Sequence, residues 1–133
     1  MFAVTCWDRL GWKDTFAKPE YTNRQIVYGR KFGDGAYTPE VVINGEVDLV
    51  GADRSQLRPA IAKATPLQGP PVTLGLNVVT VGSGNGDADV WLVRYDPRVQ
   101  NVDIGAGENS GVTIAHKNIV RVLVRLGQGL LRL

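Results

Sequence analysis

The ten residues AYTPEVVING, from Ala36 to Gly45, constrain the fold of this chain more than any other stretch. A Thr-Pro dipeptide runs directly into an apolar, β-branched segment, which is followed by Asn44, Gly45 and a second apolar run, VDLV. Asn and Gly tolerate the positive φ angles that a tight hairpin turn demands. The pattern therefore predicts two antiparallel strands joined at Asn44-Gly45.

The segments around this hairpin predict a strand and two helices. FAVTCW, at residues 2–7, is an apolar run typical of a short strand. Helical spacing predicts a helix over 15–32 with Pro19 in its first turns. A second helix is expected from the N-cap Asp53 to about residue 65, with Pro59 inside it. Strand, helix, hairpin, helix is the second part of a thioredoxin-type arrangement, so we expect the bond before Pro39 to be cis.

The second half of the chain is rich in strand signals. PLQGPP, at residues 66–71, is a stiff, turn-rich spacer and the best candidate for a domain boundary. Beyond it, VTLGLNVVTV, ADVWLVRY and NIVRVLVRL read as strands separated by glycine-rich turns. The sequence thus predicts an α+β protein: an incomplete thioredoxin-like unit at 1–65, a linker, and a small antiparallel β region within 72–133.

Charge and hydropathy exclude two classes of partner. The chain carries 15 Lys and Arg against 13 Asp and Glu, divided evenly between its halves, so neither half presents the basic surface that nucleic acid requires. No apolar run approaches the roughly 20 residues of a membrane-spanning helix. The N-terminus as written has no export signal, which predicts a cytoplasmic protein. The basic residues near the C-terminus are interpreted as a solvated strand face, with an anionic partner as the alternative: Lys117, Arg121, Arg125 and Arg132.

Cys6 is the only cysteine, so these 133 residues contain no intrachain disulfide, CxxC pair or cysteine-rich zinc site. A reactive thiolate needs a helix N-terminus or a nearby cation, and locally only Arg9 or Lys13 could supply the charge. The strand setting favours a buried small apolar side chain. A redox nucleophile or a mixed-disulfide site is the alternative.

His116 is the only histidine, which excludes a multi-histidine metal site. Ser110 and Asp103 lie near it in the sequence, but no nucleophile elbow accompanies them, so a structural hydrogen bond is the preferred interpretation. The segment GSGNGDADV resembles one calcium-binding nonapeptide with Asp87 and Asp89 as ligands, yet such repeats need several copies. We therefore expect no metal and no cofactor.

Several motifs in order resemble a thioredoxin-like, usually secreted family catalogued as domain of unknown function 1223. The resemblance covers about residues 2–127, and these segments carry it: WDRLGWKDTFAKPEYTNRQ, YTPEVVING, VGADR, ADVWLVRYDPRV, GENSG, HKNIVR and LG. It puts His116 and Asn118 in a Thr-x-x-His-x-Asn pattern of unknown role, and Glu108 in GENSG. Family members typically open with a signal peptide, a strand and a CxxC motif before the segment FAVTCWD, and this sequence contains none of these.

The resemblance implies a shortened, redox-incompetent relative whose full-length form is periplasmic or secreted. It would retain at most a surface for a protein or peptide ligand, for which the candidates are Trp7, Trp12, Tyr37, Thr38 and Pro39. The alternative is part of a thiol–disulfide oxidoreductase whose CxxC lies on a missing segment or a partner chain, and a structural β module is a third option. Without the central strand, buried backbone groups would lack partners. We therefore expect rearrangement, strand exchange into a homodimer, or poor folding of 1–65.

Overall fold

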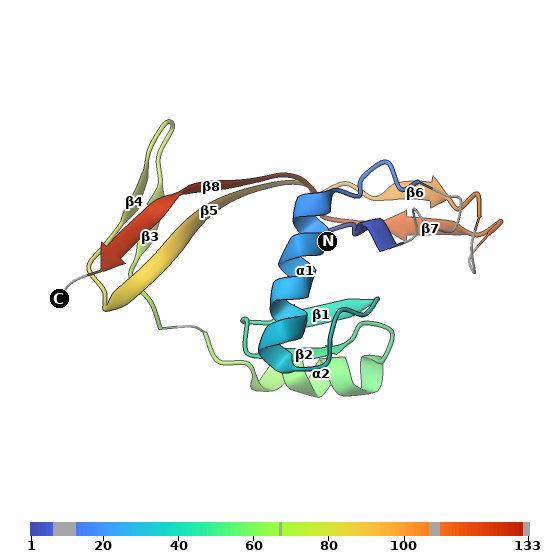
Figure 1. The fold of residues 1–133 in the computed structure, drawn as a ribbon, viewed down its shortest axis with the longest axis horizontal. Helices are drawn as coiled ribbons and strands as arrows, with labels where there is room; N and C mark the ends of the chain where they lie inside the picture. Colours follow the sequence, from blue (N-terminus) through green and yellow to red (C-terminus); the bar gives the residue numbers. More distant parts are fainter. Residues whose placement is uncertain (7–12, 67, 107–109, 132–133) are drawn as a thin grey trace. The chain divides into compact units, whose positions relative to one another are not determined.

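The structure is a computed structural model that describes residues 1–6, 13–66, 68–106 and 110–131 (Figure 1). Its described residues form two helices and eight strands, which confirms the α+β class. The strands pair two by two, as β1 with β2, β3 with β4, β5 with β8, and β6 with β7. The chain divides into two units, here called unit 1 (Met1–Glu40 and Val93–Leu123) and unit 2 (Val41–Leu92 and Val124–Leu133).

Helix α1 (Pro19–Phe32) is the main element of unit 1. Pro19 occupies the first helical position, where a missing N–H costs nothing, and Gly33 ends the helix with a φ of 87°. The predicted helix is confirmed, but it begins four residues later than expected. Asp14 is the reason, because its side chain accepts a hydrogen bond from the Phe16 amide at 2.8 Å and so stabilises a turn there.

The strand predicted at 2–7 is wrong over its described residues 2–6, which form no strand. The backbone carbonyls of Met1 and Ala3 bond elsewhere. The Met1 carbonyl accepts from the Val120 amide at 2.9 Å, and the Ala3 carbonyl accepts from the Lys18 amide at 3.4 Å. The segment has β propensity but does not pair with a neighbouring strand. The carbonyl groups of Ala3 and the adjoining Met1 bond the residue before α1 and a residue near the start of the last strand instead.

The core of unit 1 joins these N-terminal residues to the C-terminal strands. The buried apolar side chains are Ala3, Tyr21, Ile104, Ile119 and Val120. The rings of Phe2 and Tyr21 meet edge to face with centroids 5.4 Å apart, a favourable aromatic geometry. Strand β6 (Gln100–Asp103) pairs antiparallel with β7 (Thr113–His116), with Gln100 opposite His116.

Unit 2 contains the predicted hairpin and the second helix. Strands β1 (Glu40–Ile43) and β2 (Val47–Val50) are joined by a turn in which Asn44 and Gly45 have φ angles of 51° and 72°, as expected. Helix α2 (Arg54–Lys63) has Asp53 as its N-cap and runs through Pro59. The strand β1 begins in unit 1, because Glu40 belongs to that unit.

Two further strand pairs lie in unit 2 or extend from it into unit 1. Strands β3 (Val72–Leu74) and β4 (Val79–Val81) are antiparallel, and the long strands β5 (Gly86–Asp96) and β8 (Ile119–Leu131) pair with each other. The end of the spacer is held in place, because the Gly82 amide donates to the Pro71 carbonyl at 2.8 Å. None of the described residues of unit 2 is fully buried.

Neither helix combines the length and apolar character needed to cross a membrane, within the described residues.

Candidate functional site

The structure brings together two residues that the sequence separates by 32 positions. The Sγ atom of Cys6 lies 3.9 Å from the Oγ1 atom of Thr38, and the bond between Thr38 and Pro39 is cis, as the sequence predicted. Tyr37 precedes them on the same segment. Trp7 and Trp12, the other two groove candidates, lie outside the described residues. We call Cys6 and the segment Tyr37, Thr38 and Pro39 the Thr38 site.

Two polar side chains of α1 position the two segments of this site. The Thr22 hydroxyl accepts from the Thr5 amide at 3.0 Å and lies 2.9 Å from the Thr5 hydroxyl, which fixes the residue before Cys6. The Gln25 side-chain amide donates to the Tyr37 carbonyl, which fixes the residue before Thr38. Side chains three positions apart share one face of a helix. One face of α1 therefore holds both segments.

A close backbone approach reinforces this arrangement. Gly29, one turn beyond Gln25, is buried, and its carbonyl accepts from the amides of Gly33 and Gly35 at 3.0 and 3.3 Å. A Cβ atom at Gly29 would lie only 2.4 Å from the carbonyl oxygen of Gly35. The loop that leads to Thr38 thus packs directly on the helix backbone, and only glycine fits there.

The Thr38 site offers free main-chain groups. Thr38 and Pro39 are exposed, whereas Cys6 is half-buried. Among the described residues, no hydrogen bond uses the amide or the carbonyl of Thr38. An amide and a carbonyl without partners, on an exposed residue of a fixed segment, are able to bond the main chain of an extended ligand.

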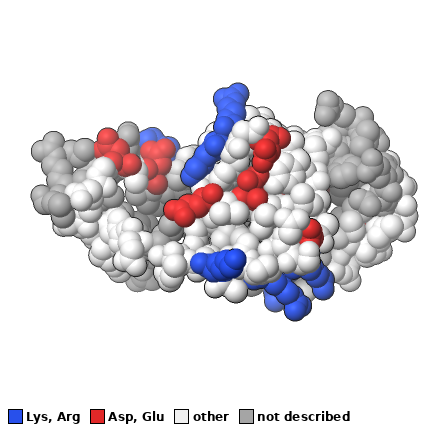
Figure 2. All heavy atoms as spheres, turned by 90° about the horizontal axis from the view of Figure 1, so that it is seen from below, with Lys and Arg blue, Asp and Glu red and all other residues white. Residues whose placement is uncertain are grey.

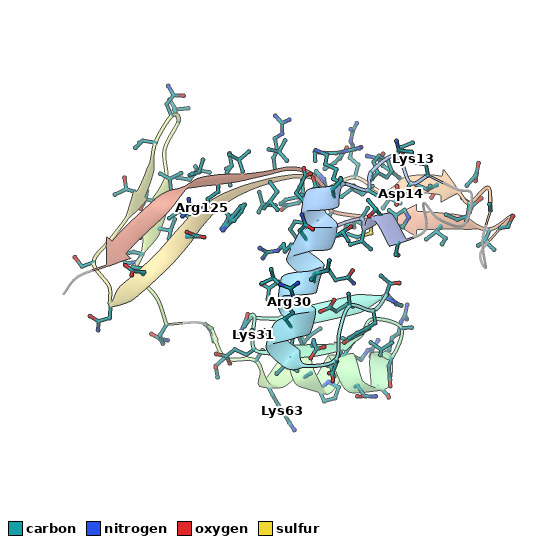
Figure 3. The ribbon with its side chains drawn as sticks, in the orientation of Figure 1. Lys13, Asp14, Arg30, Lys31, Lys63 and Arg125 are labelled. Carbon is teal, nitrogen blue, oxygen red and sulfur yellow. The ribbon has the colours of Figure 1, made fainter. Side chains whose placement is uncertain are left out.

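Of the two cations considered as activators of the Cys6 thiol, only Lys13 belongs to the described residues. Lys13 is exposed just before α1, beside the buried Asp14 (Figure 3), and Arg9 lies outside the described residues. Within the described part of the chain, Thr38 is the hydrogen-bonding partner of the Cys6 thiol. Cys6 is also the only cysteine of the chain.

Two of the basic residues predicted on a solvated strand face, Arg121 and Arg125, are partly exposed and have acidic partners, and Arg132 lies outside the described residues. Arg125 lies 2.6 Å from Asp89 of β5, and Arg121 lies 3.9 Å from Asp96 and 4.3 Å from the ring centroid of Phe16. Arg98, with a smaller contribution from Arg121, holds the pKa of the Asp96 carboxyl well below its usual range. On the face that Figure 2 shows, both signs of charge occur and neither forms a continuous field.

His116, Ser110 and Asp103 do not form a catalytic triad. His116 lies opposite Gln100, three ladder positions from Asp103, which corresponds to roughly 10 Å along the strands. Asp103 accepts from the Thr113 hydroxyl at 2.5 Å, and the Ser110 hydroxyl donates to the Gly105 carbonyl at 3.4 Å. Asp103 and Ser110 thus have other hydrogen-bond partners, and His116 lies apart from Asp103.

The other residues of the family pattern do not converge on a site either. Asn118 is exposed with a φ of 56°, and Glu108 lies outside the described residues. The described residues contain no group of three His, Cys, Asp or Glu side chains arranged to hold a metal ion. Of the two carboxylates considered as calcium ligands, Asp89 is paired with Arg125.

Sequence reasoning missed the residues that position the Thr38 site. Thr22, Gln25 and Gly29 read as ordinary members of an amphipathic helix. One signal was available, because three small or polar residues at positions i, i+3 and i+7 form a polar stripe on one helix face. Such a stripe marks contact with polar backbone, but it does not identify the contacting segment.

Comparison with known proteins gives one family and one solved structure. The family model described as protein of unknown function, DUF1223, matches residues 1–130. The crystal structure of an Agrobacterium tumefaciens protein, solved by a structural genomics consortium, is similar at 29% sequence identity with a TM-score of 0.72. The match covers 98% of this chain and 59% of the other, so this chain spans about three fifths of that protein's length. No curated protein matches. Because the family model spans nearly the whole sequence, the chain belongs to the DUF1223 family.

Proposed function

We propose that this chain is a thioredoxin-like binding module that holds an extended polypeptide segment at the Thr38 site and has no dithiol chemistry of its own. The open main chain of Thr38 is the observation that carries this proposal. Its amide and carbonyl have no partner among the described residues, and the residue is exposed. An extended peptide recognises such groups through its own backbone, largely independently of its sequence.

Preorganisation of the site supports the proposal. Gln25 fixes the carbonyl of Tyr37, and the contact between Gly29 and Gly35 fixes the loop before it. Binding to a segment that is already ordered costs less conformational entropy than binding to a mobile loop. The ligand would therefore meet the Thr38 amide in a defined direction.

The single cysteine limits the chemistry of the module. A dithiol–disulfide cycle needs two cysteines, and these residues contain one. The half-buried thiol of Cys6, 3.9 Å from the Thr38 hydroxyl, would then form a small, weakly polar side of the contact surface.

Titration with an unfolded protein that is reduced and carboxymethylated, and so carries no free thiol, tests the proposal. Thr38→Pro removes the main-chain donor, whereas Thr38→Val keeps the donor and the shape and removes only the hydroxyl. We expect Thr38→Pro to weaken binding at least about tenfold, the equivalent of one lost hydrogen bond, and Thr38→Val to bind like the wild type. Equal affinities of the two variants, with circular dichroism showing both folded, would refute the role of the amide.

A second candidate function rests on the proximity of Cys6 to Thr38. In this alternative the chain is part of a thiol–disulfide oxidoreductase, a cysteine pair outside these residues reduces the substrate disulfide, and Thr38 holds the substrate beside Pro39. A disulfide reductase assay of the purified chain, with dithiothreitol as reductant, tests the binding module. A binding module shows no turnover, whereas turnover that disappears in Cys6→Ser would contradict it, because Cys6 itself would then be a nucleophile.

A further inference from the structure

We infer that the β3–β4 hairpin of unit 2 is a docking surface for a second copy of this chain. The first observation is the register of the hairpin. Val72 lies opposite Val81, and Leu74 opposite Val79, so one face consists of four apolar side chains. The other face carries the Thr73 and Thr80 pair.

The β3 side of this apolar face is left largely uncovered by the described residues, whereas Val79 and Val81 of β4 are half-buried. The side chains of Val72 and Leu74 are 63% and 70% exposed, and Leu76 at the turn is fully exposed. We call these three side chains the hairpin surface. A two-stranded hairpin is marginally stable alone, and the described residues of unit 2 contribute no buried side chain beside it. Neighbouring exposed apolar side chains of this kind mark an interaction surface.

The base of the hairpin is anchored, so the hairpin surface is presented in a fixed form. The Gly82 amide donates to the Pro71 carbonyl at 2.8 Å, just below the last ladder pair. A Cβ atom at Gly82 would lie 2.6 Å from Cγ of Pro71, and one at Gly84 would lie 3.2 Å from Cβ of Pro70. The two prolines thus pack against two glycines, and this packing restrains both strands where they leave the hairpin.

The charge pattern indicates which partner fits. The segment from residue 64 to residue 86 contains no Asp, Glu, Lys or Arg, in a chain of which 21% of residues are charged. Exposed strands normally carry charges that prevent pairing with another chain, and this hairpin has none. A surface without charge is complementary to a second copy of itself, since a two-fold axis brings equivalent residues together without like-charge repulsion.

A lipid surface fits the same segment less well. Side chains that dock on membranes usually include Trp or Tyr at the headgroup level and basic residues that attract anionic lipids. Residues 64–86 contain no aromatic and no basic side chain. The composition therefore favours the second copy.

Analytical ultracentrifugation of the full 133-residue chain tests this inference. Val72→Glu and Leu76→Glu each put a carboxylate into the hairpin surface. Val27→Glu is the matched control, because Val27 is a valine on α1 that is also 63% exposed. We expect the wild type and Val27→Glu to dimerise with equal affinity, and the two hairpin variants to dimerise at least about tenfold more weakly, because the interface would bury an unpaired charge.

Two outcomes would overturn the inference. One is a wild-type chain that stays monomeric up to about 100 µM, a concentration at which even weak self-association becomes visible. The other is a loss of affinity in Val27→Glu as large as in the hairpin variants. Sedimentation with phosphatidylcholine vesicles tests the alternative that the hairpin surface binds lipid. A monomeric wild type that binds these vesicles and loses binding in Leu76→Glu would assign the hairpin surface to lipid instead.

Discussion

The hydroxyl of Tyr21 donates a hydrogen bond to the backbone carbonyl of Val120, at 3.3 Å and in the buried core of unit 1. The two residues are 99 positions apart, so this bond joins the helix that builds the Thr38 site to the last long strand. The helix is thereby fixed to the rest of unit 1 by a polar contact as well as by apolar packing.

Replacement of Tyr21 by Phe should destabilise the protein by about 1–2 kcal/mol, because the Val120 carbonyl would remain buried without a partner. Chemical unfolding in urea measures this change. Tyr28→Phe is the control, since the bond from Arg24 to the Tyr28 hydroxyl is only partly buried and its loss should cost less. A Tyr21→Phe variant as stable as the wild type would mean that the carbonyl finds water.

Replacement of Gly29 by Ala should also destabilise the protein, although Gly→Ala inside a helix normally stabilises by about 1 kcal/mol. The sign reverses because the added methyl would lie 2.4 Å from the Gly35 carbonyl oxygen. Overpacking of this kind typically costs about 1–3 kcal/mol. Gly127→Ala is the control, as its Cβ would meet nothing within 4 Å. Equal unfolding midpoints of the two variants would contradict the close approach.

Thr22→Val should loosen the segment that carries Cys6 without changing the helix around it. The substitution keeps the shape of the side chain and removes the acceptor of the Thr5 amide. We expect the half-buried Cys6 thiol to react faster with an aromatic disulfide reagent, because the residue before it is no longer fixed. Thr15→Val, an exposed threonine before α1, serves as the control. An unchanged reaction rate in Thr22→Val would show that other contacts hold Cys6.

Stability should fall with pH in the acid range, partly through Asp53. Hydrogen bonds from Ser55 and then Gln56 lower the pKa of the Asp53 carboxyl below its usual value. A folded-state pKa below the unfolded one contributes stability that is present above the unfolded value, about 4, and is lost as the pH falls below it. Urea midpoints measured between about pH 6 and pH 3 should therefore decrease.

Asp53→Asn isolates the contribution of Asp53 to this pH dependence. Asparagine is also a good N-cap, so the start of α2 keeps an acceptor that does not titrate in this range. We expect a shallower dependence of the midpoint on pH in the variant than in the wild type. Identical slopes would mean that the Asp53 hydrogen bonds do not persist in solution.

Local chemistry explains which elements could be predicted. The turn at Asn44 and Gly45, the N-cap Asp53 and the end of α1 at Gly33 depend on backbone φ angles and capping bonds within a few residues. The strand at 2–7 failed because its pattern carries no information about partners. In the folded chain the Ala3 carbonyl accepts from Lys18, and the adjoining Met1 carbonyl accepts from Val120.

The Thr38 site could be predicted only in part for the same reason. The Thr-Pro pair before the hairpin marked one segment, and Cys6 was noted as the only thiol. The contact between them depends on Thr22 and Gln25, whose bonds reach 17 residues back and 12 residues forward along the chain. Such pairings follow from how α1 packs, which periodicity alone does not specify.

Hydrogen exchange at the Thr38 amide, followed by NMR with and without the carboxymethylated unfolded probe, tests whether the main chain of Thr38 binds an extended polypeptide. The open main chain predicts rapid exchange in the free protein and clear slowing when the probe is bound, while the exposed amide of Asn44 in the β1–β2 turn stays unchanged. A Thr38 amide that is already protected in the free protein, or that exchanges equally fast with the probe bound, would contradict binding through the Thr38 main chain.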